Sequence, residues 1–72
     1  MYRVFEALDE LSAIVDAIAS LPQEQREAFL LQAEGDLCVE EIALITSASF
    51  ETTKSRLRYA KTKLRELLKE YA

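Results

Sequence analysis

Residues 49–71 of the chain are SFETTKSRLRYAKTKLRELLKEY, a pattern that predicts one long helix with two different sides. Apolar side chains recur at steps of three and four residues, which places them on one side of a helix. These positions are Phe50, Leu57, Ala60, Leu64, Leu67, Leu68 and Tyr71, with Thr53 in the same stripe. A cationic stripe beside them comprises Lys54, Arg58, Lys61, Arg65 and Lys69. The residues expected to point away from the apolar side are Glu51, Ser55, Tyr59 and Thr62. We expect the apolar side to sit in a small core, with Phe50, Leu57, Ala60 and Leu64 inside it, and the cationic side to meet an anionic partner.

Length and composition favour a small helical domain. The chain has 72 residues, which is enough for one domain with one core. Half of the residues are hydrophobic, and glycine and proline occur once each, which argues against a turn-rich β fold. We predict an all-α, four-helix domain over residues 1–72, with a helix-turn-helix at about residues 37–71.

The residue types that build common active and metal sites are scarce. The chain has no histidine, and Cys38 is its one cysteine, so neither an intrachain disulfide nor a structural zinc site is expected. There is no glycine-rich phosphate loop and no Cys–His or Ser–His pair, so we expect no enzyme, no cofactor and no metal. No apolar run is long enough to cross a membrane and no signal peptide is evident, which favours a cytoplasmic protein.

Charge is segregated along the chain. The net charge is −4, but residues 1–50 hold ten acids and two bases, whereas residues 51–72 hold three acids and seven bases. Exposed charges are screened beyond about 8–10 Å at physiological salt. The cationic end can therefore bind an anionic polymer despite the negative total.

Three shorter helices are predicted before the long one. The first covers residues 2–19, and its apolar face comprises Phe5, Leu8, Leu11, Val15 and Ile18, with Ile14 beside them. Pro22 fits the first position of the second helix, which we predict at residues 22–34. The apolar residues of this helix cover too much of its circumference for one narrow stripe, so we expect it to be the helix most enclosed by the others. Gly35 is expected to end that helix in the left-handed conformation.

The third helix is predicted at residues 37–46, with Cys38 at its cap and Glu41 in the matching position of a capping box. Its inward side chains are expected to be Val39, Ile42, Ala43 and Ile45. A polar turn follows, and Ser49 is a good N-cap for the long helix. A short helix, a turn and a longer helix form the helix-turn-helix layout, whose second helix can enter the DNA major groove. Ordinary three-helix packing gives the same spacing.

Three blocks of sequence, in order, resemble region 4 of bacterial sigma factors, and most closely the extracytoplasmic-function group. The blocks are LP and QREAFLL at residues 21–22 and 25–31, EEIA at 40–43, and TTKSRL with AKTKL at 52–57 and 60–64. The similarity covers roughly residues 10–70. It implies an all-helical domain that binds the −35 promoter element through its last helix and directs RNA polymerase to initiate transcription. It also implies docking on the flap of the polymerase β subunit and masking by an anti-sigma factor.

The resemblance carries site residues over to the long helix. The base-facing candidates are Glu51, Thr52, Ser55, Arg58 and Tyr59. The phosphate candidates are Lys54, Arg56, Lys61 and Lys63. The backbone amides around Val39 and Glu40 are a further phosphate site through the helix dipole.

The sequence departs from the family pattern at several positions. Cys38 stands where serine is usual, Ser47 and Glu51 where glycine is usual, and Thr53 where valine is usual. Arg58 and Tyr59 also differ from the commoner pair, so we predict no particular promoter sequence. The resemblance does not include the other domain of these sigma factors, which melts the −10 element. This favours a fragment of a longer sigma factor over a free-standing relative.

Two other functions fit the same layout. One is a LuxR-type transcription-regulator DNA-binding domain, although that group lacks the SRLR run found here at residues 55–58. The other is a helical interaction module that binds RNA polymerase or an anti-sigma factor through the acidic helices, without contacting DNA. In that case the basic stripe is only a solvated helix face.

Overall fold

The computed structural model describes residues 4–69, and the surroundings of side chains from residue 11 onward. Four helices follow one another: α1 (Val4–Ala19), α2 (Gln23–Ala33), α3 (Val39–Thr46) and α4 (Phe50–Leu67). Within residues 4–69 there is no strand, so the predicted all-α class is confirmed. None of these helices has the length and apolar character that a membrane crossing requires.

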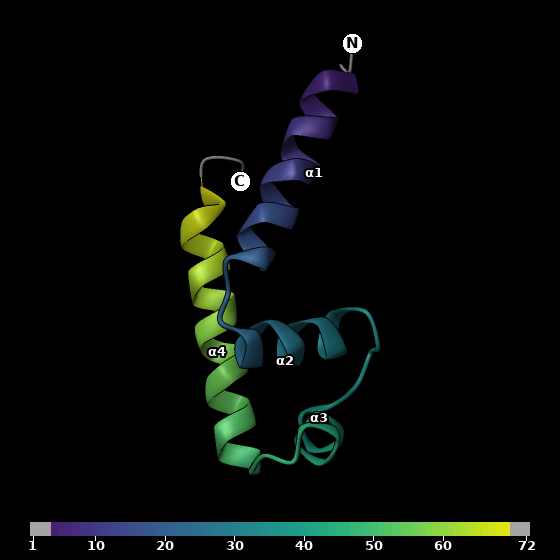
Figure 1. Cartoon of the computed structure of the whole chain (residues 1–72), viewed down its shortest axis with the longest axis vertical. Coiled ribbons are helices and arrows are strands. Elements are labelled where there is room, and N and C mark those ends of the chain that lie inside the picture. The colour runs from purple at the N-terminus through teal and green to yellow at the C-terminus, as the bar shows by residue number, and fades with distance from the viewer. Residues whose placement is uncertain (1–3, 70–72) are drawn as a thin grey trace.

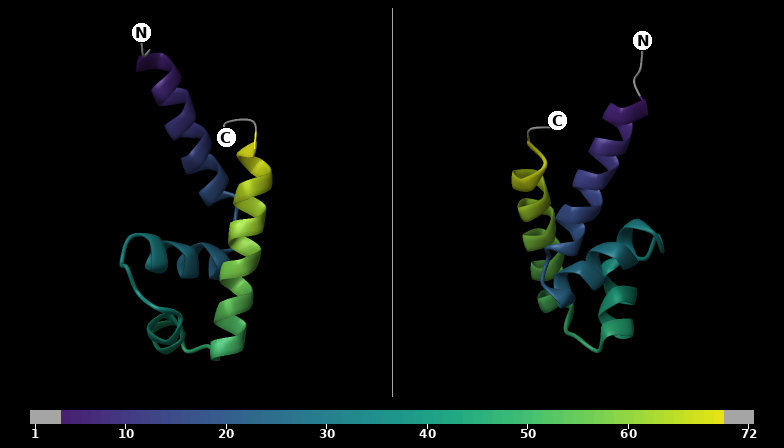
Figure 2. Two further views of the ribbon diagram at one scale, coloured as in Figure 1. Left: turned by 180° about the vertical axis from the view of Figure 1, so that it is seen from behind. Right: turned by 45° about the horizontal axis from the view of Figure 1, so that its top comes forward.

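The other helices are arranged along α4 (Figure 1). α2 crosses the middle of α4, α3 lies beside its first turns, and α1 leaves α2 and diverges from the far end of α4. Figure 2 shows the same divergence of α1 and α4 from two other directions. The helix predicted from residues 49–71 is therefore the one against which the rest of the domain packs.

The core consists of two clusters that both include α4. Ala28, Ile42 and Leu57 form the first, with Leu31, Leu37 and Val39 packed around it. Ala17, Leu21, Ala60 and Leu64 form the second, with Ile18, Phe29 and Leu68 packed around it. Thr53 is fully buried between the helices, and its hydroxyl donates to the Ser49 carbonyl at 2.9 Å, so no polar group is left unsatisfied there.

The predicted core of the long helix is correct at three positions and wrong at the fourth. Leu57, Ala60 and Leu64 are buried, but Phe50 keeps 43% of its surface exposed. Phe50 is the first residue of α4 and lies outside both core clusters. The ammonium group of Lys54 lies 5.6 Å from the centre of its ring.

The predicted inner face of α1 is confirmed at Ile18, which packs against the second core cluster, and is wrong at Leu11 and Val15. Leu11 and Val15 remain 58% and 63% exposed, whereas the small Ala17 is buried against α4. Among the described side chains of α1, Ala17 and Ile18 near its end contact the core, and the small alanine there lets the backbones of α1 and α4 approach closely. Phe5 and Leu8 lie outside the described side chains. Arg26 donates from Nη1 to the Ala19 carbonyl at 3.1 Å, which joins α2 to the end of α1.

α2 is not the most enclosed helix, contrary to the prediction. Ala28 is its one buried residue, whereas α4 buries four. Pro22 is the N-cap residue of α2 and not its first helical residue, so the helix begins one residue later than predicted. The prediction for Gly35 is also wrong, because the left-handed residue is Asp36, with φ 52°.

Gly35 is needed for space rather than for its backbone freedom. Its N–H donates to the Leu31 carbonyl at 3.1 Å, and the chain turns tightly back over the end of α2. A Cβ atom at this position would lie 2.7 Å from the same Leu31 oxygen, which is closer than real Cβ contacts allow.

α3 begins at Val39, later than predicted, with Cys38 at the N-cap. The Cys38 N–H donates to Glu41 Oε1 at 3.0 Å, which is the Glu41 half of the predicted capping box. This backbone bond, with a second contact to the Cys38 side chain, lowers the pKa of Glu41. Ile42 and Ala43 are buried as predicted, but Ile45 is 59% exposed. A helix of two turns has one side against the core, and Ile45 lies on the other.

Candidate nucleic-acid interface

The turn between α3 and α4 fixes where the long helix begins. Ser47 ends α3 in the left-handed conformation, with φ 56°, at the position where glycine is usual. Ser49 is the N-cap of α4, and its Oγ accepts from the Thr52 N–H at 3.0 Å. The Ser49 hydroxyl also donates to Thr52 Oγ1 at 2.8 Å. Thr52, predicted to face a base, is thus tied into the cap, which the Ser49-to-Thr52 spacing could have indicated.

The buried side of α4 determines which residues it presents outward. Successive residues of a helix are turned by about 100°, so the direction of each follows from the buried set. That buried set is Thr53, Leu57, Ala60 and Leu64. The residues on the opposite side, which we call the α4 ridge, are Glu51, Ser55, Tyr59, Thr62 and Glu66. Tyr59 is 56% exposed, whereas Ser55 is half-buried among its larger neighbours.

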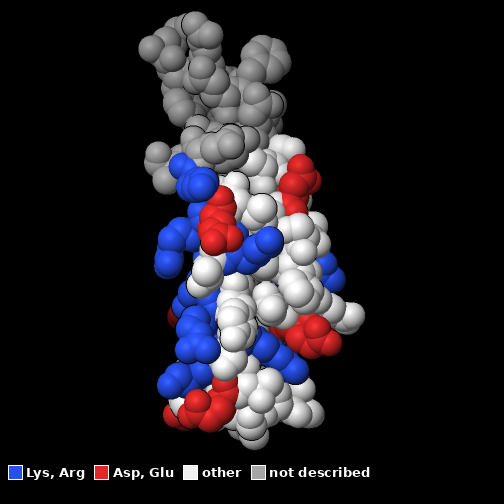
Figure 3. Space-filling view, turned by 90° about the vertical axis from the view of Figure 1, so that its left-hand side faces the viewer, with Lys and Arg blue, Asp and Glu red and all other residues white. Residues whose placement is uncertain are grey.

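Cations flank the α4 ridge on both sides, not on one side as the sequence suggested. Lys54, Arg58, Lys61 and Arg65 form one row, and Arg56 and Lys63 form the other. We call these the first and second cation rows. Figure 3 looks onto this side of the molecule and shows Lys and Arg on both sides of a strip of uncharged side chains, with acids among them. Arg56 and Lys63 are seven residues apart, so they share one side of the helix. The helical period puts that side across the ridge from Lys54 and Lys61.

The first cation row borders one groove between α4 and its neighbours, and Lys63 of the second row borders another. The first groove, of about 340 Å³, is lined by Gln32, Val39, Lys54, Leu57, Arg58, Lys61 and Arg65. The second, of about 320 Å³, is lined by Pro22, Gln25, Tyr59, Thr62, Lys63 and Glu66. The first groove brings Lys54 and Arg58 to Val39, the first residue of α3. The proposed amide site at the start of α3 and the first cation row are therefore neighbours.

The cations of α4 are available to an external partner. Lys54, Arg58, Lys61 and Lys63 are exposed, and Arg56 is half-buried. Among the described residues, the one Lys or Arg side chain that donates a hydrogen bond is Arg26, which belongs to α2 and not to α4. The guanidinium of Arg58, in the first cation row, lies 5.4 Å from the centre of the ring of Tyr59 on the ridge, which is a cation–π arrangement.

Residues 11–64 match the sequence profile of the family described as Sigma-70, region 4. The chain belongs to this family. It is a sigma-factor DNA-binding domain with a helix-turn-helix, and its family implies promoter DNA and RNA polymerase as partners. The extracytoplasmic-function type predicted from the sequence is consistent with this family. A search of curated proteins found no match to the chain.

Proposed function

We propose that this sigma region 4 domain binds the −35 element of a promoter by placing α4 in the major groove. RNA polymerase would thereby be directed to initiate transcription at that promoter. The observation that supports this most strongly is the charge arrangement on α4, with a polar ridge between two cation rows. The major groove is about 12 Å wide and admits a helix. Phosphates line both of its edges, so cations on both sides of the ridge can each reach a strand.

The two sets of residues have different roles in this proposal. The base-facing set is Glu51, Thr52, Ser55, Arg58 and Tyr59, and the phosphate-contacting set is Lys54, Arg56, Lys61 and Lys63. Arg58 would donate to O6 and N7 of guanine, the base edge that suits a guanidinium. Glu51 would accept from the amino group of cytosine, and its charge also favours the N-terminal end of α4.

Binding of this kind is tested by selecting duplexes from a random library on the immobilised domain. The affinity of the selected and unselected duplexes is then measured by fluorescence anisotropy. Arg58→Ala is expected to lower the preference for the selected sequence by about tenfold or more. Lys54→Ala is expected to weaken all duplexes alike, because a phosphate contact carries no sequence information. The absence of binding to any duplex at low salt contradicts the proposal.

We also infer that the domain docks on the flap of the polymerase β subunit and that an anti-sigma factor masks it. The exposed apolar side chains Leu11 and Val15 on α1 support a protein contact away from the α4 ridge. Replacing both by serine should lower recovery of the β flap in a pull-down and leave DNA affinity unchanged. If the domain instead binds only proteins, charge reversal at Lys54 and Arg58 should change neither the pull-down of the β flap nor any DNA-binding measurement.

A further inference from the structure

A groove between α2 and the second half of α4 combines an apolar floor with cations at its edge. It has a volume of about 350 Å³ and is lined by Phe29, Lys61, Leu64, Arg65 and Leu68. We call it the α2–α4 groove. Its three apolar residues belong to the second core cluster or pack against it, and Phe29 and Leu68 are only half-buried. The groove therefore offers a ligand apolar surface that the described part of the fold leaves uncovered.

The two cations of the α2–α4 groove are close enough to hold one anionic group. Lys61 and Arg65 are four residues apart, which is about 6 Å along the axis of α4 and puts them on the same side of the helix. Both are exposed, and among residues 11–69 neither donates a side-chain hydrogen bond. Leu64 and Leu68 each follow one of these cations by three residues, so the apolar floor adjoins the cations directly. A carboxylate that accepts from both cations would have apolar surface beside it.

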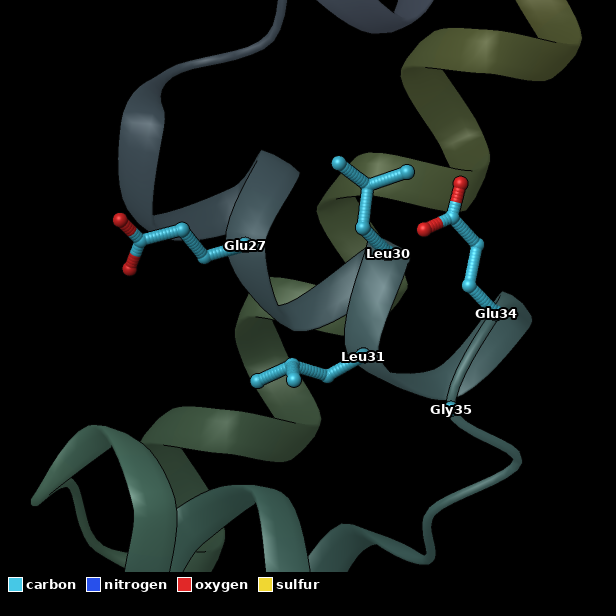
Figure 4. Close-up of a pocket in the computed structure, with 5 residues that line it drawn as sticks. All are labelled: Glu27, Leu30, Leu31, Glu34 and Gly35. Carbon is cyan, nitrogen blue, oxygen red and sulfur yellow. The ribbon is translucent and has the colours of Figure 1, made fainter.

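The outer side of α2 carries a groove of the opposite charge. That groove also has two apolar residues, Leu30 and Leu31, but the charges around it are those of Glu27 and Glu34. Figure 4 shows the two leucines with the carboxylates of Glu27 and Glu34 extending to either side. An anionic ligand is therefore attracted to the α2–α4 groove and repelled from the outer side of α2, which supplies an internal control.

We propose that the α2–α4 groove binds a fatty acid. Its carboxylate accepts from Lys61 and Arg65, and its hydrocarbon chain lies on Phe29 and Leu68. Cations at one edge and apolar surface beside them suit a molecule with one anionic end and one apolar end, because each part then meets its complement. The DNA backbone has phosphates for the cations but no apolar chain for the floor.

A bound fatty acid would compete with DNA, and this consequence rests on the proposed function. Lys61 and Arg65 also line the first groove and belong to the first cation row. Lys61 is one of the proposed phosphate contacts, so a carboxylate held there takes the place of a phosphate. The fatty acid would thus lower the affinity of the domain for its promoter.

The test titrates the whole domain with dodecanoate, below its micelle concentration, and follows the backbone amides by nuclear magnetic resonance. Shift changes are expected at Phe29, Leu64 and Leu68, and not at Leu30 and Leu31. Octanoate is expected to bind more weakly, because each buried methylene contributes up to about fourfold in affinity. Dodecyltrimethylammonium, which has the same chain and a cationic head, is expected not to bind in the groove.

Two double variants separate the groove from overall charge. Lys61→Gln combined with Arg65→Gln is expected to weaken dodecanoate binding by about tenfold, because both attractions to the carboxylate are lost. Lys54→Gln combined with Lys63→Gln makes the same change in net charge outside the α2–α4 groove, and is expected to have a much smaller effect on dodecanoate. All four side chains are exposed, and circular dichroism checks that the fold is kept.

Dodecanoate binding is measured without DNA, so its failure can be told apart from failure of the proposed function. With a labelled duplex bound, dodecanoate is expected to release it from the wild-type domain. The proposal is overturned if dodecanoate leaves Phe29 and Leu68 unshifted, if both double variants weaken it equally, or if the cationic amphiphile binds as well. It is also overturned if an acidic Leu/Glu peptide binds the groove more tightly than dodecanoate, or if bound dodecanoate does not release the duplex.

Discussion

The salt dependence of DNA binding tests the two cation rows of α4 quantitatively. The proposed phosphate contacts are Lys54, Arg56, Lys61 and Lys63. Each neutralised phosphate contributes about −0.9 to the slope of log K against log salt, so the four together predict a slope of about −3.6. Raising salt from about 50 to about 200 mM should therefore weaken binding by about 150-fold.

Removing one cation from each row should change this slope in equal steps. Lys61→Gln in the first row and Lys63→Gln in the second should each reduce it to about −2.7, and the double variant to about −1.8. All of these side chains are exposed, so the fold should be kept, and circular dichroism checks this. Lys69→Gln is the matched control, because Lys69 follows α4 and lies outside the proposed contacts.

The assay is fluorescence anisotropy of a labelled duplex over a series of salt concentrations for each variant. Equal steps for Lys61→Gln and Lys63→Gln would mean that both rows meet the phosphates. If only one of them changes the slope, α4 meets a single strand and the two-row interpretation is refuted. If Lys69→Gln changes it as much as the others, the binding follows overall charge and not the proposed geometry.

Four further predictions concern the stability of the domain. Ser49→Ala removes the N-cap of α4 and should lower the free energy of unfolding in urea by about 1 kcal/mol. Gly35→Ala should lower it by about 1–3 kcal/mol, because the new Cβ meets the Leu31 carbonyl; a gain in stability would show that the turn relaxes instead. The lowered pKa of Glu41 means that its carboxylate stabilises the fold at neutral pH, and that this contribution is lost as pH falls through the lowered pKa, below the ordinary value of 4.5. Glu41→Gln should remove this part of the pH dependence in urea titrations at a series of pH values, and an unchanged curve would contradict it. Glu34→Lys should raise Tm by about 2–4 °C in a thermal melt, because a cation suits the end of α2; a lower Tm would contradict the dipole argument.

The order and type of the helices could be predicted because the local signals agree with one another. Ser49 is a strong cap, and Leu57, Ala60 and Leu64 recur at helical spacing through the part of α4 that the other helices cross. The one proline and the one glycine mark the two ends of α2 to within a residue or two. These signals depend on neighbouring residues only, so the sequence carries them in full.

The surroundings of the large apolar side chains could not be predicted in the same way. Phe50, Val15 and Ile45 fit helical stripes, yet all three remain exposed, while Ala17 is buried. A stripe indicates which residues share a side of a helix, but not whether another helix covers that side. A small domain has little interior, so helices that meet only near their ends leave part of each stripe uncovered.

The candidate site was predicted as a set of residues but not as an arrangement. The cations of α4 were all evident in the sequence, and the helical period fixes their angles. The buried face of α4 is the predicted apolar stripe with Thr53 in it, but which cations lie beside α2 and α3 depends on how those helices pack on that face. Once that face is known, Arg56 and Lys63 separate from Lys54 and Lys61 across the ridge.

Nuclear magnetic resonance of the ¹⁵N-labelled domain, titrated with duplex DNA, tests the central claim most directly. The shift changes should concentrate on the backbone amides of the first half of α4 and at the start of α3, around Val39, and should leave Leu30 and Leu31 unchanged. Shift changes that concentrate on α1 and α2 while α4 stays unaffected would contradict the account.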